Sequence, residues 1–161
     1  MSINSRTKGR RGESQLAAAL TVLTGRTWRR TAQRRGTATA DVEADGVALH
    51  VECKRINGGL QRLHLFAQSH PLILLGDLWC CELHRLHKAL TIDVTHAPET
   101  RAPSLIVDAM KQANRDRLLS HVPLVCARQD GHGWLACWQW SDDDALRAVM
   151  EPLLRAKEHS P

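Results

Sequence analysis

The chain has 161 residues and 43% of them are hydrophobic, which is enough for an ordinary globular domain with a buried core. Its net charge of +5 and isoelectric point near 9.3 suit a polyanionic partner. The N-terminus is polar and basic, which argues against a secretory signal, and the longest apolar run, residues 71–75, is too short to span a membrane. The five cysteines show no pairing framework, which argues against a disulfide scaffold. We therefore expect a reduced, cytoplasmic protein.

The positive charge is concentrated in the first 35 residues, where Glu13 is the only acidic residue. The cations there are Arg6, Lys8, Arg10, Arg11, Arg26, Arg29, Arg30, Arg34 and Arg35. Such a cluster is typical of proteins that bind a phosphate backbone, although a merely solubilising surface is the alternative. Because the chain has one phenylalanine, five tryptophans and no tyrosine, we do not expect stacking on exposed bases to dominate.

The first predicted element is a helix within residues 8–25. Leu16 and Leu20 fall on one helical stripe, and Gly25 suits the position just after the helix. Glu13 lies on the same stripe, and a carboxylate that faces the protein body is costly unless it is paired or bound to a metal. We therefore expect Glu13 to belong to a site, the alternative being a favourable interaction with the helix dipole.

A strand over residues 27–32 and a basic loop over residues 33–40 precede a predicted hairpin over residues 41–54. Asp45-Gly46 is a strong turn signal, because both positions tolerate a positive φ. Folding the chain there places Asp41 opposite His50.

Alternation of side chains gives this hairpin one apolar and one ionisable face. The apolar face carries Val42, Ala44, Val47, Leu49, Val51 and Cys53, and the other carries Asp41, Glu43, Ala48, His50, Glu52 and Lys54. Charges on an outer face are most often simply solvated. Asp41, Glu52 and Lys54 together, however, have the groups needed to hold a divalent metal beside a phosphodiester.

The rest of the chain is less regular. Residues 60–103 match no pattern beyond an alternation at residues 90–95 that predicts a strand. A helix is expected from Ser104 to about Ser120, with Lys111, Gln112 and Arg115 on its polar face as candidates to reach the site. Strands over residues 122–128 and 134–140 are expected to form a second hairpin, followed by a last helix that begins near Ser141.

The order of these features resembles the PD-(D/E)XK nuclease superfamily, and within it Holliday junction resolvases and small phage-type endonucleases. The resemblance covers residues ~6–55, with Ala40 standing where the family usually has proline. It implies an α/β fold with a restriction-endonuclease-like core, that is, a central mixed β-sheet flanked by helices. We expect a single domain over residues 1–161, with an unmatched insertion at about 60–103.

The resemblance also implies an Mg²⁺-dependent DNA endonuclease, with Mn²⁺ as a possible substitute, that acts on four-way junctions as a homodimer in recombination or repair. The catalytic residues would be Glu13, Asp41, Glu52 and Lys54. The metal ligands would be Asp41, Glu52, Glu13 and the carbonyl of Cys53. The candidates for DNA contact are Lys8, Arg10, Arg11, Arg29, Arg30, Arg34, Arg35, Arg55, Lys111, Gln112 and Arg115.

Two alternatives remain open, a nuclease for other branched, damaged or foreign DNA and a non-catalytic DNA-binding module on the same scaffold. Clustered carboxylates repel phosphate unless a metal intervenes, which favours catalysis. Separately, Cys80, Cys81, His84 and His87 are residues of the type that binds zinc, but the usual second, distant ligand pair is missing. We expect these cysteines to pack inward and the histidines to lie at the surface.

Overall fold

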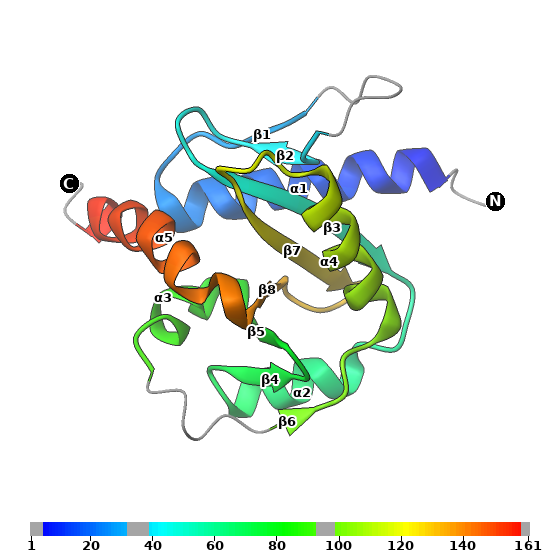
Figure 1. Ribbon diagram of the computed structural model, residues 1–161. Helices are drawn as coiled ribbons and strands as arrows, with labels where there is room; N and C mark the ends of the chain where they lie inside the picture. The colour runs from blue at the N-terminus through cyan, green and yellow to red at the C-terminus, as the bar shows by residue number, and fades with distance from the viewer. Residues whose placement is uncertain (1–4, 32–38, 93–98, 159–161) are drawn as a thin grey trace.

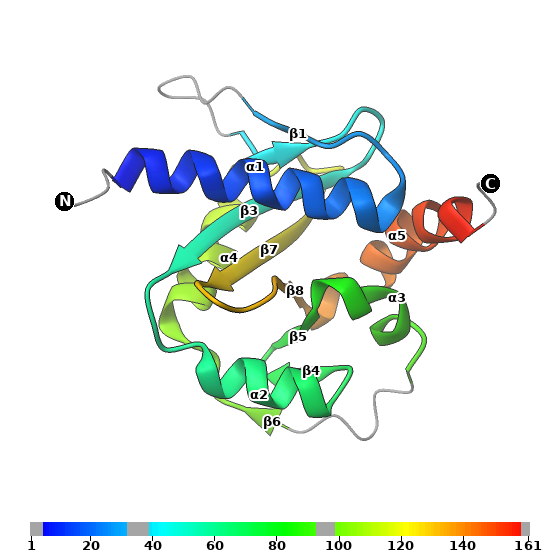
Figure 2. The same cartoon turned by 180° about the vertical axis from the view of Figure 1, so that it is seen from behind.

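The computed structural model describes residues 5–31, 39–92 and 99–158. Within them an eight-stranded mixed sheet, in the order β1-β2-β3-β7-β8-β5-β4-β6, has helices on both faces (Figures 1 and 2). The strands are β1 (Arg29–Arg30), β2 (Val42–Glu43), β3 (Leu49–Ile56), β4 (Ile73–Leu75), β5 (Leu78–Glu82), β6 (Glu99–Thr100), β7 (Val122–Gln129) and β8 (Leu135–Gln139). The helices are α1 (Ser5–Thr24), α2 (Gln61–Ser69), α3 (Leu86–Ala89), α4 (Ser104–Asp116) and α5 (Asp143–Glu158), with 3₁₀ turns η1 (Leu83–Arg85) and η3 (Trp140–Asp142). The predicted α/β class with a central mixed sheet is confirmed.

Helix α1 forms as its apolar stripe predicts. Leu16 and Leu20 are fully buried against the sheet. The helix ends at Gly25, whose φ is +70° and whose N–H donates to the carbonyl of Thr21 at 2.9 Å. Glycine takes this left-handed conformation without steric strain, so it can close the last turn.

The predicted hairpin turn is also present. Gly46 has a φ of +72°, and the N–H of Val47 donates to the carbonyl of Ala44 across Asp45-Gly46 at 3.2 Å. This is the two-residue turn that the sequence indicates.

The predicted pairing of the two arms is wrong by two residues. Val42 pairs with Val51, whereas uninterrupted pairing from the turn would have matched it with Leu49. The N–H of Leu49 instead donates to the carbonyl of Val47 at 2.9 Å, so a tight local bend takes up two residues of the second arm. Because side chains alternate with a period of two, this even shift leaves the apolar and ionisable faces unchanged.

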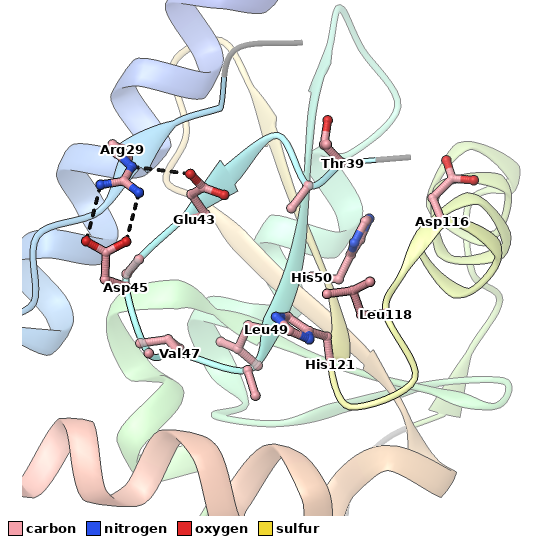
Figure 3. A pocket seen from close by; sticks show the side chains of 14 residues that line it. Arg29, Thr39, Glu43, Asp45, Val47, Leu49, His50, Asp116, Leu118 and His121 are labelled. Carbon is pink, nitrogen blue, oxygen red and sulfur yellow. Dashed lines mark hydrogen bonds and ion pairs between the residues drawn. The ribbon is translucent and has the colours of Figure 1, made fainter. Parts of the chain in front are cut away.

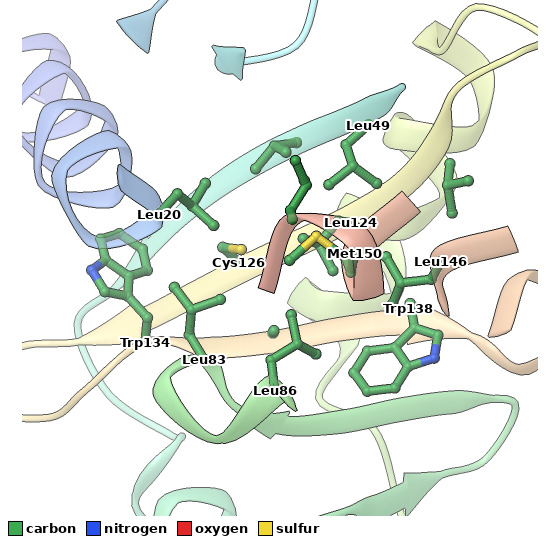
Figure 4. Packing of buried hydrophobic residues seen from close by; sticks show 14 of the residues in the cluster. Leu20, Leu49, Leu83, Leu86, Leu124, Cys126, Trp134, Trp138, Leu146 and Met150 are labelled. Carbon is green, nitrogen blue, oxygen red and sulfur yellow. The ribbon is translucent and has the colours of Figure 1, made fainter. Parts of the chain in front are cut away.

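Each face of the sheet has its own hydrophobic core. The first core joins α1, α3 and α5 to the apolar face of the hairpin, and Figure 4 shows Leu20, Cys126 and Met150 packed within it. The second core joins α2 and α4 to the opposite face of β7, at Val125 and Ala127. The ionisable face of the hairpin therefore lies on the side of the sheet that α4 covers.

The unmatched segment, residues 60–103, supplies α2, β4, β5, α3 and β6, and its strands continue the same sheet beyond β8. The strand expected at residues 90–95 is wrong for 90–92, which form a turn and bend after α3, and residues 93–95 lie outside the described chain. The fourth helix ends at Asp116, four residues before the expected end, and the last helix begins at Asp143, after a 3₁₀ turn that includes Ser141.

The second hairpin is confirmed as β7 and β8, which pair in antiparallel fashion. In the described chain, no helix has the combination of length and apolar character needed to cross a membrane.

Candidate active site

The carboxylate of Asp41 lies against the backbone of β3. Asp41 directly precedes β2, and its Oδ2 accepts a hydrogen bond from the backbone N–H of Cys53 at 2.8 Å. Burial and the nearby charge of Glu52 raise the pKa of Asp41 to about 6, although the Cys53 N–H and Lys54 act in the opposite direction. The two carboxylates are therefore close enough to repel one another.

Glu52 is more deeply buried than Asp41, with 1% of its surface exposed. Its Oε1 lies 3.2 Å from Nε2 of His50, and its Oε2 accepts a hydrogen bond from Nζ of Lys54 at 3.1 Å. Burial alone would raise the pKa of Glu52, but the contact with His50 and the charge and hydrogen bond of Lys54 outweigh it, so the pKa is lowered. Glu52 is thus held as an anion beside a carboxyl group that resists ionisation.

Helix α4 completes this side of the site. Gln112 projects toward β3 and accepts a second hydrogen bond from Nζ of Lys54, at 3.2 Å. One turn further along α4, Asp116 has a lowered pKa because Arg115 donates a hydrogen bond to it, with smaller contributions from His50 and Gln112. The side chains of β3 and α4 therefore form one polar cluster.

Glu13 approaches from the other helix, α1. Only 8% of Glu13 is exposed, and its charge adds to the effects that raise the pKa of Asp41. Its buried Oε2 has no hydrogen-bond partner among the described residues, although Nη1 of Arg30 lies 3.5 Å away. A buried carboxylate oxygen without a hydrogen bond is unfavourable, so this atom, held only by the ion pair with Arg30, could still accept a ligand.

Gly12 allows α1 to pack closely on β3. A Cβ atom at this position would lie 2.7 Å from Cδ of Arg55 and 3.6 Å from Sγ of Cys53. Any larger residue would require either the side chain of Arg55 or the helix to shift.

The donor set at this site fits a hard divalent cation. Asp41, Glu52 and Glu13 offer only carboxylate oxygens, and Mg²⁺ is commonly bound by one or two carboxylates, with water and substrate oxygens filling its other positions. Across the residues that are described, no three His, Cys, Asp or Glu side chains are already gathered closely enough to enclose a metal by themselves. The arrangement therefore suits an open site that substrate would complete, and not an all-protein cage.

The zinc-type residues are spread over three elements. Cys80 and Cys81 are buried in β5, His84 is exposed in η1, and His87 is half-buried in α3. The inward packing of the cysteines is confirmed, and only one of the two histidines is fully at the surface.

The cations predicted to contact DNA are placed differently from one another. Arg10 and Arg11 are exposed on α1. Lys8 and Arg55 both form ion pairs with Asp130, that of Lys8 at 3.8 Å. Lys8 also donates a hydrogen bond to Asn57. Arg10 and Arg11 are thus exposed to a ligand, whereas Lys8 and Arg55 are engaged in ion pairs.

The remaining candidates are mostly engaged or distant. Arg29 forms ion pairs with Glu43 at 3.2 Å and with Asp45 at 2.8 Å, and Arg30 faces Glu13. Arg115 is exposed beside Asp116, and Lys111 lines a separate hollow with Leu75, Asp77 and Asp108. Arg34 and Arg35 lie outside the described residues. The structure brings Glu13, Asp41, Glu52, Lys54 and Gln112 together and leaves Lys111 elsewhere.

Two residues of the cluster, His50 and Asp116, were not among the predicted site residues. The alternation of the hairpin had put His50 on the ionisable face, but a single histidine there gives no sign of a specific contact. Asp116 lies four positions after Gln112, which is the spacing of neighbours on one helix face. That spacing is the signal that could have identified it.

Comparisons with protein-family models, curated proteins and solved structures find no match to this chain. Its function has to follow from the geometry of its own residues.

Proposed function

We propose that this protein is a divalent-cation-dependent endonuclease that hydrolyses phosphodiester bonds in DNA. The observation that carries the proposal is the placement of Asp41 and Glu52, two buried and mutually repelling carboxyl groups, beside the ammonium group of Lys54. Such a pair lowers the stability of the folded protein unless a cation joins it. A cation-dependent activity gives a reason for that arrangement.

Each residue has a distinct part in this proposal. Bound Mg²⁺ would supply the positive charge that activates water and polarises the phosphate. Asp41 and Glu52 would hold it, with the carbonyl of Cys53 and the carboxylate of Glu13 as further ligands. Lys54 lies between Glu52 and Gln112, where its charge would stabilise the anionic phosphate.

A nucleic acid is the polymer that the charge distribution favours, and the resemblance to PD-(D/E)XK nucleases favours DNA. The net charge is +5, and exposed Arg10 and Arg11 lie on α1, the helix that carries Glu13. The resemblance to PD-(D/E)XK nucleases favours a four-way junction cut by a homodimer. A hollow beside His50 favours a second candidate within the class, a nuclease for DNA with unpaired nucleotides.

Cleavage of labelled four-way junction, flap, single-stranded and linear duplex DNA in Mg²⁺ tests the proposal. We expect Glu52→Gln to lower the rate by at least about 100-fold, because one metal ligand is lost, and to keep or tighten DNA binding, because a negative charge near phosphate is removed. Lys54→Ala should reduce turnover more than affinity.

Two results would count against the proposal. Cleavage that survives in Glu52→Gln would assign it to a contaminant or to another site. Tight DNA binding without cleavage of any substrate would make the protein a non-catalytic DNA-binding module.

A further inference from the structure

A pocket of about 620 Å³ adjoins the candidate active site on the side of the hairpin turn (Figure 3). His50 belongs to both, because its imidazole lines the pocket while its Nε2 contacts Glu52 at 3.2 Å. Ala40, the neighbour of Asp41, also lines it. The volume is in the range of pockets that bind small organic groups. A group covalently linked to a phosphate at the carboxylates would reach this space.

The charges around the pocket do not favour a phosphate. Three carboxylates line it, those of Glu43, Asp45 and Asp116. The one guanidinium among the described lining residues, that of Arg29, is already bonded to Glu43 and Asp45, as the dashed lines of Figure 3 show. Asp116 is bonded to Arg115 from outside the pocket. An anion entering here would meet carboxylates and find no uncommitted cation among the described lining residues.

The remaining surfaces of the pocket suit a flat, uncharged, partly polar group. His121 presents an imidazole ring, and Leu118, 65% exposed, adds an apolar side chain next to it, while the buried His50 also lines the pocket (Figure 3). Nucleobases stack on histidine as they do on other aromatic side chains. The hydroxyl of Thr39 and the carboxylate of Asp116 offer hydrogen-bonding groups for the edge of a base. The imidazole of His121 thus offers a surface for stacking in a chain that has one phenylalanine and no tyrosine.

We propose that this pocket receives an unpaired nucleobase adjacent to the phosphodiester that is cleaved. The inference rests on the proposed nuclease function and specifies its substrate. A base inside a duplex would have to unstack to enter, and that cost is smallest where the base is already unpaired. The preferred substrates are therefore bulged, mismatched or flapped DNA, ahead of a fully paired duplex.

Three substitutions separate the pocket from the catalytic cluster. Ala48 lines the pocket, and Ala48→Leu adds side-chain volume there while Asp41 and Glu52 stay unchanged. Leu118→Ala removes a lining side chain, and its matched control is Leu119→Ala, because Leu119 is fully exposed and is not among the lining residues. If Ala48→Leu does not fold, as judged by thermal unfolding, the comparison of Leu118→Ala with Leu119→Ala tests the pocket by itself.

The substrates are duplexes that carry one unpaired nucleotide next to the mapped cleavage site, with a fully paired duplex and an abasic nucleotide at the same position for comparison. We expect the base-containing bulge to be cleaved at least about tenfold faster than either comparison. Ala48→Leu should abolish this preference and retain slow cleavage of the paired duplex. Leu118→Ala should weaken the preference, and Leu119→Ala should leave it unchanged. Equal rates with the base and the abasic nucleotide, or a preference that persists in the filled pocket, would overturn the inference.

A second readout does not depend on cleavage. With 2-aminopurine as the unpaired base, binding by Glu52→Gln should change its fluorescence, and adding Ala48→Leu should remove that change. If no Glu52-dependent cleavage exists, the proposed function fails and this fluorescence still shows whether the pocket takes a base. If cleavage is present and the fluorescence is the same with and without Ala48→Leu, the nuclease stands and the base pocket is wrong.

Discussion

Asp41 and Glu52 are both buried, yet their neighbours act on them in opposite directions. The pKa of Asp41 is raised by burial and by the charge of Glu52, whereas His50 and Lys54 outweigh burial to lower the pKa of Glu52. The pair therefore carries an energetic penalty at neutral pH that falls mainly on Asp41. We interpret that penalty as the consequence of keeping a cation site ready in the absence of the cation.

Replacing Asp41 should stabilise the protein at neutral pH in a metal-free buffer. Since the pKa of Asp41 is raised from 3.8 to about 6, the folded state binds the proton more tightly, and stability falls as the pH rises through this window. Asp41→Asn removes that loss and still accepts the N–H of Cys53. We expect a gain of about 3 kcal/mol at pH 7 that disappears near pH 3.

Urea unfolding with a chelator at the two pH values measures this gain. Asp108→Asn, an exposed carboxyl on α4, is the matched control and should change stability by less than about 0.5 kcal/mol. A variant at Asp41 that is less stable than wild type at pH 7 would show that its carboxylate is not under repulsion.

At the level of elements, α4 presents two adjacent polar residues in different directions. Gln112 bonds Lys54, and Lys111 lines the separate hollow near Asp77. We expect Gln112→Ala to lower the turnover number about tenfold, equivalent to about 1.4 kcal/mol of transition-state stabilisation, because Lys54 loses one of its two anchors. Lys111→Ala should stay within about twofold of wild type in steady-state cleavage. Equal losses of turnover in both variants would mean that α4 acts through its overall charge and not through the contact of Gln112 with Lys54.

Helix α1 brings exposed cations to one end of the molecule. Its 20 residues span ~30 Å, so Arg10 and Arg11 are far from its C-terminal end, where Gly25 meets Lys157. Replacing both arginines by alanine should weaken DNA binding and reduce the slope of log affinity against log salt by about 1 to 2. The same double change at Arg155 and Lys157 on α5 is the control. An unaltered slope in the α1 variant would show that these arginines do not meet phosphate.

The sequence was informative where structure is local. Periodicity identified α1, the β7–β8 hairpin and most of α4, and alternation identified both faces of the first hairpin. The pairing shift escaped prediction because the bend at Val47–Ala48 depends on one local hydrogen bond and not on residue type. The elements of residues 60–103 were not predicted, because their strands are short. In addition, β5 pairs with β8, more than 50 residues away along the chain, as at Cys80 and Cys137.

The same distinction holds for the site. Asp41, Glu52 and Lys54 share one hairpin, so alternation alone predicted that they face the same side. The contacts of Glu52 with His50 and of Lys54 with Gln112 depend on rotamers and on the packing of α4 over β3, which composition does not encode.

At the scale of the whole molecule, two separate cores share one sheet, and the second contains a buried histidine. His64 is 1% exposed and stacks on His132 with ring centroids 4.4 Å apart. Its Nε2 has no hydrogen-bond partner within the described chain. Burial, with a contribution from His132, lowers the pKa of His64 to about 4.

This histidine should make global stability depend on pH. Between about 4 and 6.5 the unfolded chain binds more protons at His64 than the folded chain, so stability falls as the pH is lowered through this window. We expect His64→Leu to remove a loss on the order of 2 kcal/mol between pH 6.5 and 4.5. His84→Gln, at an exposed position, should keep the wild-type slope in chemical denaturation. An identical slope in all three proteins would assign the dependence to other groups.

We propose above that Asp41 and Glu52 form a site for a divalent cation. Titration with Mn²⁺ tests for this site, because the electron paramagnetic resonance signal reports the free ion. The proteins are wild type, Asp41→Asn and Glu52→Gln, each with and without a short DNA whose phosphates can complete the site. We predict one site per chain that is tightened by DNA and weakened at least about tenfold in each variant. Equal Mn²⁺ binding by all three proteins, or none by wild type even with DNA, would show that Asp41 and Glu52 do not form a cation site.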